Sequence, residues 1–291
     1  MNTEVDAAQP VVVGIDGSDA ALAAARWAAD YAARSAASLV LVHAVPRLDW
    51  HFLTDAPAPA ESQDNAADSV LGTVEAAVRA EHPDLDVRTA TVKKPVAAAL
   101  QEASDGARLL VLGTGTDDGI VGSHVVRITH RAPCPVLVWR APVAHRTGKP
   151  LPVVVGIDES ADSLRALTAA FDTAQILGAP VTVVHMWEIS AAVGLGYSQG
   201  LMDWQLLDLL QTQQRRRMEE LVAPLAEKYP NAHVNEVFQD ISPAKGLRDL
   251  SRKAQLVVVG SHGRGKVAMS ALGSVSQNVL YHAECPVLVV R

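Results

Sequence analysis

The sequence predicts an α/β protein made of two tandem five-stranded parallel sheets with helices on both faces. Two observations support this: four sequence blocks occur twice in the same order, and short apolar runs alternate with longer helix-like segments. Apolar runs of four to six residues without in-out alternation are typical of strands covered on both faces. Each copy is therefore expected to read β-α-β-α-β-α-β-α-β.

The repeat sets the domain boundaries. The first block, VVVGIDGS at residues 11–18, matches VVVGIDES at residues 153–160 at seven of eight positions. The blocks that follow pair Leu39–His43 with Val181–His185, Leu109–Gly113 with Leu256–Gly260, and Cys134–Arg140 with Cys285–Arg291. Such repetition indicates gene duplication. We predict domains at residues 1–141 and 153–291, joined by a linker at 142–152 that is rich in proline.

The loops after the first and fourth strands predict the strand order. Asp16 and Asp158 follow the first strand of each copy, and Gly113 and Gly260 end the fourth. In open parallel sheets the ligand lies beyond the carboxyl ends of the strands, where the strand order reverses. If the two loops share a site, the first and fourth strands are neighbours, and right-handed crossovers give the Rossmann-like order 3-2-1-4-5.

Capping residues and prolines predict the helices. Ser18 and Ser160 stand where a helix N-cap is expected. Segments after Pro95 and Pro243 are expected to form the third helix of each copy, and a fourth leads to the last strand. The long amphipathic segment at 204–229 is expected to bend or end near Pro224.

Composition excludes several classes of protein. The sequence has no apolar run long enough to cross a membrane, and residues 1–10 lack the pattern of a signal peptide, so we expect a cytoplasmic protein without a membrane partner. A net charge of −7 argues against a nucleic-acid partner. Cys134 and Cys285 lie in matching Cys-Pro-Val-Leu-Val segments and are interpreted as core residues. No histidine pair has the spacing of a metal site, and His43 and His185 are interpreted as structural.

A glycine-rich loop in the second copy has the chemistry of an anion site. It runs from Gly260-Ser-His-Gly263 to Gly273-Ser274 and includes Arg264 and Lys266. Glycines allow main-chain N–H groups to approach phosphate oxygens, and the start of a helix adds further N–H donors. Glycines alone are also typical of a surface turn. Their combination with an aspartate directly beyond a buried strand favours the binding site.

This pattern resembles the ATP-binding class of the universal stress protein family, in its tandem two-domain form. The resemblance rests on Gly260, Gly263, Gly273 and Ser274 at their spacing, together with Asp158. It implies that Asp158 lies by the adenosine and that the backbone near Met186 borders the adenine. It also implies that Gly260 and Gly263 line the path of the ribose and phosphates, and that Gly273, Ser274 and Val275 contact phosphates. We add Gly156 and Arg264 to this ATP site and leave an accompanying Mg²⁺ open.

The first copy departs from the pattern. Gly14, Asp16, Gly113, Gly122 and Ser123 remain as candidate binding residues. The second glycine position is Thr116, followed by Asp117 and Asp118, and Cys134 follows Gly113 by 21 residues where Cys285 follows Gly260 by 25. Acidic residues repel phosphate. We expect this half to bind a triphosphate poorly and leave a smaller ligand open.

These observations favour an ATP-binding stress or signalling module over an enzyme, with ATP hydrolysis weak at most. Two alternatives stay open: a slow ATP hydrolase or nucleotidyl-transfer enzyme, and a partner-binding protein with an empty site. The last strands, Val136–Trp139 and Val287–Val290, would be apolar edges if left bare. We expect them to pair as an internal pseudo-dimer, in the way the resemblance implies, and leave a homodimer and the signalling partner open.

Overall fold

The computed structural model describes residues 9–46, 60–115, 122–141, 150–187, 204–263 and 272–291. The chain divides into two compact units, one comprising Met1–Pro142 with Pro286–Val289 and the other Val143–Cys285 with Val290–Arg291. The linker predicted at 142–152 falls mostly outside the described residues, so the domain boundaries stay a prediction.

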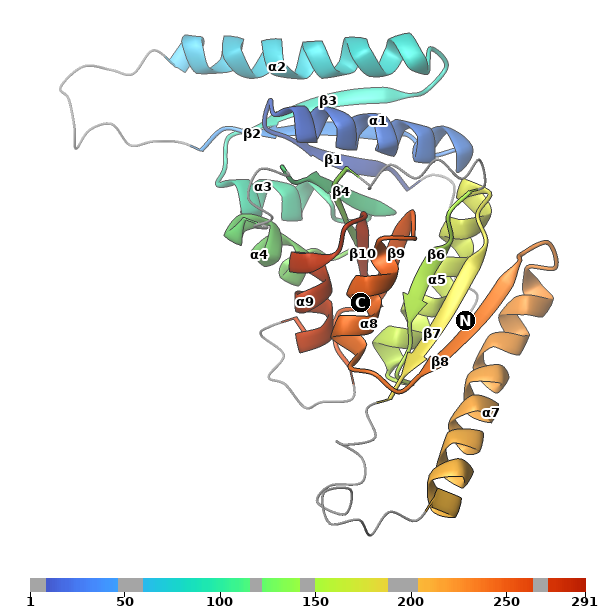
Figure 1. Ribbon diagram of the computed structural model, residues 1–291. Coiled ribbons are helices and arrows are strands. Elements are labelled where there is room, and N and C mark those ends of the chain that lie inside the picture. The colour runs from blue at the N-terminus through green and yellow to red at the C-terminus, as the bar shows by residue number, and fades with distance from the viewer. Residues whose placement is uncertain (1–8, 47–59, 116–121, 142–149, 188–203, 264–271) are drawn as a thin grey trace. The chain divides into compact units, whose positions relative to one another are not determined.

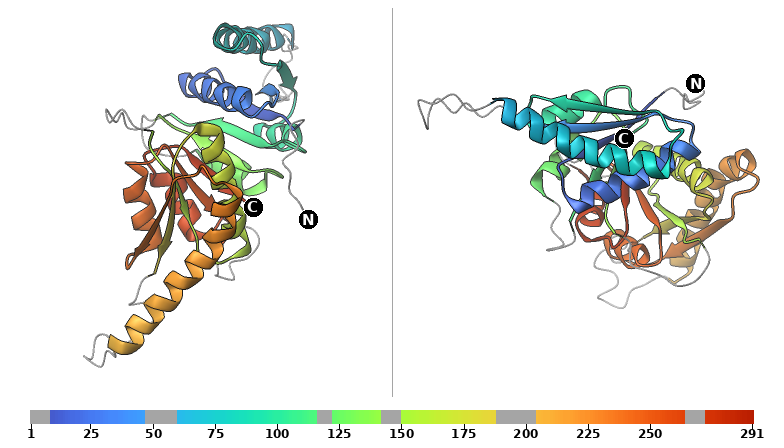
Figure 2. Two further views of the ribbon diagram at one scale, coloured as in Figure 1. Left: turned by 90° about the vertical axis from the view of Figure 1, so that its right-hand side faces the viewer. Right: turned by 90° about the horizontal axis from the view of Figure 1, so that it is seen from above.

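The first unit follows the expected alternation of strands and helices (Figure 1). Its elements are β1 (Val11–Ile15), α1 (Asp19–Arg34), β2 (Leu39–Ala44), α2 (Ala60–Glu81), β3 (Val87–Val92), α3 (Val96–Ala103), β4 (Leu109–Gly113), α4 (Ser123–Arg131) and β5 (Val136–Trp139). Helices α1 and α2 contact each other on one face of the strands, and α3 and α4 contact each other on the opposite face (Figures 1 and 2).

The second copy repeats this order. Its elements are β6 (Val153–Gly156), α5 (Ala161–Leu177), β7 (Val181–Met186), α7 (Trp204–Lys228), β8 (Val234–Gln239), α8 (Pro243–Ser251), β9 (Leu256–Gly260), α9 (Ser274–His282) and β10 (Val287–Val290). Of the two outcomes expected near Pro224, a bend or an end of the helix, the second is wrong, because α7 continues past the proline to Lys228. Val222 and Tyr229, on either side of the proline, are buried.

The strand order is 3-2-1-4-5 in each copy, as predicted. Strand β1 pairs in parallel with β2 and β4, and β6 pairs in parallel with β7 and β9. The central residues of these strands are buried, which agrees with sheets covered on both faces. Ser18 and Ser160 cap α1 and α5 by accepting hydrogen bonds from the N–H groups of Ala21 and Ser163.

The prediction of two separate sheets is wrong. Strand β10 pairs antiparallel with β5, with Leu288 opposite Leu137, so all ten strands form a single sheet. This pairing agrees with the expected pseudo-dimer and explains why Pro286–Val289 belongs to the first compact unit. Two apolar edge strands satisfy each other's main-chain N–H and C=O groups when they pair.

None of the described helices is both long and apolar enough to cross a bilayer.

Candidate functional site

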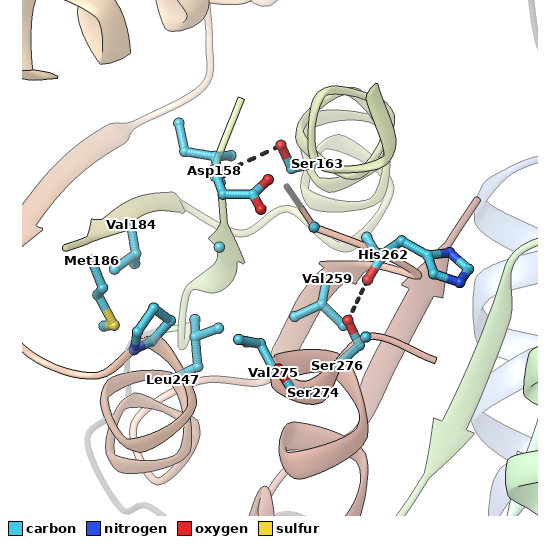
Figure 3. A pocket seen from close by; sticks show the side chains of 16 residues that line it. Asp158, Ser163, Val184, Met186, Leu247, Val259, His262, Ser274, Val275 and Ser276 are labelled. Atoms are coloured by element: carbon cyan, nitrogen blue, oxygen red, sulfur yellow. Dashed lines mark hydrogen bonds between the residues drawn. The ribbon is translucent and has the colours of Figure 1, made fainter. Parts of the chain in front are cut away.

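A cavity of about 250 Å³ lies at the carboxyl ends of β6, β7 and β9 in the second unit (Figure 3). Eight residues assigned to the second-copy site from the sequence line it: Gly156, Asp158, Met186, Gly260, Gly263, Gly273, Ser274 and Val275. The ninth, Arg264, and its neighbour Lys266 lie outside the described residues. The structure thus brings together every described residue of the predicted second-copy site.

The loop after β6 fixes the carboxylate of Asp158 at the edge of this cavity. Its Oδ1 atom accepts hydrogen bonds from the Ser160 hydroxyl at 2.6 Å and the Ser160 N–H at 3.1 Å. The N–H of Asp158 donates to Oγ of Ser163 at 3.3 Å, an interaction drawn in Figure 3. Because Ser160 also caps α5, the orientation of the carboxylate is tied to the start of that helix.

Two cavity glycines are required for different reasons. A Cβ atom on Gly263 would lie 2.5 Å from Oδ2 of Asp158, so the missing side chain leaves room for the carboxylate. A Cβ atom on Gly260 would lie 2.8 Å from the carbonyl carbon of Asp162, so this glycine allows the first turn of α5 to approach β9. The sequence interpretation attributed both glycines to ligand approach, whereas helix packing also requires Gly260.

The start of α9 closes the polar side of the cavity. Gly273 donates its N–H to the carbonyl of Ser261 at 2.8 Å, and the hydroxyl of Ser276 donates to the carbonyl of Gly260 at 2.5 Å. These two bonds hold the helix start against the end of β9. The first N–H groups of a helix have no acceptor within it, and they carry partial positive charge. Ser274 and Val275 therefore present donors suited to an anion.

The opposite wall is apolar and includes residues that the sequence interpretation missed. Val184, Met186 and Val259 come from β7 and β9, and Pro243 and Leu247 come from α8 (Figure 3). Pro243 and Leu247 are four residues apart and so lie on the same face of α8, which was the only signal in the sequence that could have indicated them. The two walls give the cavity one side for a planar apolar group and one side for polar groups.

Glycines behind this wall allow the close packing. A Cβ atom on Gly156 would lie 2.8 Å from Cδ1 of Leu247, and a side chain on Gly246 would overlap the end of Met186. Gly156 therefore has a packing role in addition to lining the cavity.

A hydrogen-bonded cluster lies beside the cavity, at the first turn of α5. Oδ2 of Asp162 accepts the hydroxyl of Ser261 at 2.6 Å and the N–H of His262 at 3.0 Å. Burial alone would raise the pKa of Asp162, but the bonds from Ser261 and His262, together with Arg165, lower it below its usual value. Burial also lowers the pKa of Arg291, against the opposing effect of Asp162. Asp162 was not among the residues chosen from the sequence.

The two strand-ending histidines have structural partners, as interpreted from the sequence. Nδ1 of His185 lies 3.1 Å from the carbonyl oxygen of Ile157, and Nδ1 of His43 lies 2.7 Å from that of Ile15. His185 is buried and stacks on Phe238. Each histidine therefore joins the second strand of its copy to the end of the first.

The first copy keeps part of this geometry. Oδ1 of Asp16 accepts hydrogen bonds from the Ser18 hydroxyl at 2.6 Å and N–H at 2.9 Å, although Asp16 is exposed where Asp158 is half-buried. A Cβ atom on Gly113 would lie 2.5 Å from the carbonyl oxygen of Ala20, which repeats the packing role of Gly260. Gly14 packs against Leu100 in the same way that Gly156 packs against Leu247.

The remaining candidates of the first copy lie around the loop that precedes α4. Gly122 and Ser123 stand at the start of α4, at the places that Gly273 and Ser274 take in α9. Thr116, Asp117 and Asp118 lie outside the described residues, so the predicted acidic character of this loop stays a prediction.

Comparison with known proteins identifies the family. The model of the universal stress protein family matches residues 8–140 and again residues 151–291. The chain belongs to the universal stress protein family. A universal stress protein of Mycobacterium tuberculosis (strain H37Rv) is 35% identical over 295 residues, covering 97% of this chain and 96% of the relative. One from Mycolicibacterium smegmatis is 31% identical over 292 residues, with the same coverage.

A solved structure supports the fold of this universal stress protein. The crystal structure of a universal stress protein from Archaeoglobus fulgidus matches with a TM-score of 0.72 at 18% identity, covering 97% of this chain and 98% of that one. A universal stress protein crystallised in complex with cAMP matches 46% of this chain and 99% of its own, at 26% identity and a TM-score of 0.36. The first match shows that the tandem fold occurs in another family member.

The described residues contain no group of three or more His, Cys, Asp or Glu side chains placed to hold a metal ion. Cys134 and Cys285 are buried, as expected for core residues, and neither is in a disulfide bond.

Proposed function

We propose that the second copy binds ATP and that the chain acts as a nucleotide-dependent stress or signalling module in the cytoplasm. One observation carries this proposal: a single cavity gathers all eight described residues that the sequence assigned to the second-copy site. These residues come from three strand ends and one helix start, far apart in the chain. Their convergence at the carboxyl edge of the sheet is where an open α/β fold binds its ligand.

The two walls of the cavity suit the two parts of a nucleotide. The adenine would pack between Val184, Met186 and Leu247, which offer apolar contact without charge. The carboxylate of Asp158 would accept a hydrogen bond from the ribose. The phosphates would lie toward Gly263 and the start of α9, whose N–H groups favour negative charge.

The side chains beside the proposed phosphate position favour binding over catalysis. The hydroxyl of Ser261 donates to Asp162, but Ser261 is 1% exposed and does not line the cavity, so a bound phosphate has no access to it. We propose that ATP hydrolysis is slow and that occupancy changes the binding of a signalling partner. Release of ADP at more than about 1 s⁻¹ would instead indicate an enzyme of ordinary turnover.

The first test is to denature the purified protein and identify any nucleotide that it releases. Calorimetric titration of nucleotide-free protein with ATP, ADP and cyclic AMP, with and without Mg²⁺, then gives affinities. We expect Asp158→Ala to weaken ATP binding about tenfold or more. The matched variant Asp16→Ala removes the corresponding carboxylate of the first copy and should leave the tight site unchanged.

Two results would contradict the proposal. One is a wild-type protein that releases no nucleotide and shows no heat of binding with any of the three ligands. The other is an equal loss of ATP affinity in Asp158→Ala and Asp16→Ala, which would contradict the proposal that the tight site lies in the second copy.

A further inference from the structure

Asp162 lies outside the cavity but contacts the segment between two of its glycines. It is the second residue of α5, and its side chain is 16% exposed. One carboxylate oxygen, Oδ1, pairs with Arg165 on the same helix. The other, Oδ2, faces the end of β9 and accepts the two hydrogen bonds from Ser261 and His262. Nδ1 of His262 lies 3.3 Å from the same oxygen.

Ser261 and His262, which join Gly260 to Gly263, are also held by other hydrogen bonds. The N–H of Ser261 donates to the carbonyl of Val290 at 2.6 Å, and its own carbonyl accepts the N–H of Gly273. The carbonyl of His262 accepts the hydroxyl of Ser160 at 3.3 Å. Asp162 accepts the Ser261 hydroxyl and the His262 N–H, and these bonds fix the peptide between the two residues.

This peptide lies next to the cavity. His262 is one of the residues that line it, and Figure 3 shows its imidazole ring pointing away from Asp158 and Met186. The peptide that Asp162 holds leads directly to Gly263, which faces the carboxylate of Asp158. A rotation of this peptide would move the Gly263 backbone relative to Asp158.

The first copy has lost the groups that make this contact. Ala20 occupies the position of Asp162, Thr114 that of Ser261, and Gly115 that of His262. The hydroxyl of Thr114 donates instead to the carbonyl of Trp139 at 3.1 Å. The fold therefore does not require the contact between Asp162 and the end of β9, because the corresponding elements of the first copy, α1 and β4, pack closely without it.

We propose that Asp162 is a positioning residue for the nucleotide site, which presets the Gly260–Gly263 backbone before a phosphate-bearing ligand binds. The inference rests on the proposed function, because it assigns a role in that same site. A loop that is already ordered loses less conformational entropy on binding, so the ligand binds more tightly. A binding backbone also needs to be held within about 0.5 Å of its productive geometry, and contacts from behind the site supply that restraint.

The test compares Asp162→Ala with Asp162→Asn. Alanine removes both acceptor contacts, whereas the asparagine side-chain oxygen can still accept from Ser261 and His262. We expect Asp162→Ala to weaken ATP affinity on the order of tenfold in calorimetry, and asparagine to restore it to within about threefold of wild type. Asp19→Ala removes a first-turn carboxylate from α1 and controls for the helix dipole; it should leave affinity unchanged.

Hydrogen exchange gives a second readout on the nucleotide-free protein. The His262 amide should exchange about tenfold faster in Asp162→Ala and at nearly the wild-type rate in Asp162→Asn. If the alanine variant does not fold, Ser261→Ala removes the contacts of the hydroxyl with Asp162 and with Nδ1 of His262 but keeps the bond from the His262 N–H to Asp162, and it should give an intermediate loss of affinity.

The outcomes separate the two proposals. Wild-type affinity in folded Asp162→Ala would overturn the positioning role and leave nucleotide binding intact. Equal ATP affinity in Asp162→Asn and Asp162→Ala would also overturn it, because an oxygen that accepts the two hydrogen bonds would then not restore binding. A wild-type protein that binds no nucleotide would overturn the proposed function and this inference with it.

Discussion

Replacing Gly263 with alanine perturbs the cavity at one atom. The added Cβ would lie 2.5 Å from Oδ2 of Asp158, and the next nearest atom, Cγ of the same residue, is 3.6 Å away. Ordinary contact at such a position begins at 3.4 Å, so the overlap is close to 0.9 Å (3.4 − 2.5) and falls on the carboxylate alone. Either the carboxylate rotates or the loop after β9 moves outward.

The magnitude follows from what holds the carboxylate. Its other oxygen accepts two hydrogen bonds from Ser160, and bonds to a charged group contribute about 1.5–3 kcal/mol each. Weakening one of them should cost about 1.5 kcal/mol. If the bound state requires the present position of Asp158, Gly263→Ala should weaken ATP binding about tenfold, since 1.4 kcal/mol corresponds to roughly a factor of ten.

Calorimetric titration with ATP measures this loss, with Gly115→Ala as the matched control. Gly115 lies in the corresponding loop of the first copy, and a Cβ atom there would meet no atom within 4 Å. The control should change affinity less than about twofold, although both substitutions stiffen the unfolded chain similarly. In an Asp158→Ala background, Gly263→Ala should have little further effect, because the clashing oxygen is gone. Wild-type ATP affinity in Gly263→Ala, or full additivity in the double variant, would refute the reasoning.

Three further predictions concern stability, and urea denaturation measures each. Gly260→Ala and Gly113→Ala each force a Cβ atom against the backbone of a helix, so each should lower the free energy of unfolding by about 1–3 kcal/mol. A loss below about 0.5 kcal/mol in both variants would contradict the packing role of these glycines. Ser160→Ala removes the cap of α5 and a partner of the Asp158 loop, and should cost about 1 kcal/mol; an unchanged midpoint would argue against the cap. Burial raises the pKa of Cys134 from 9.0 to about 11, so above pH 9 the thiol ionises more readily in the unfolded chain and stability falls as pH rises. The stability of wild type relative to Cys134→Ala should drop by about 2 kcal/mol between pH 8 and 10.5, and a constant difference would exclude this effect.

The candidate site shows which residues a sequence can indicate. Gly263, Gly273 and Asp158 are recognisable because their spacing and their place after apolar runs are visible along the chain. Leu247 and Asp162 are not, because nothing local separates a leucine on an amphipathic helix or an acid in a first helical turn from many others. Their roles depend on which strand end each of them faces in the folded protein.

By itself, the sequence determined the duplication, the strand order within each copy and the glycine spacing of the second copy. These features can be predicted because residue patterns are visible locally along the chain, and because a small set of rules governs how short connections join strands and helices. Only the tertiary structure decided that β5 and β10 join the strands into one sheet, that Gly260 allows α5 to approach β9, and that Asp162 holds the backbone before Gly263. Each of these depends on atoms far apart in the chain, which contact one another only after the strands and helices have packed.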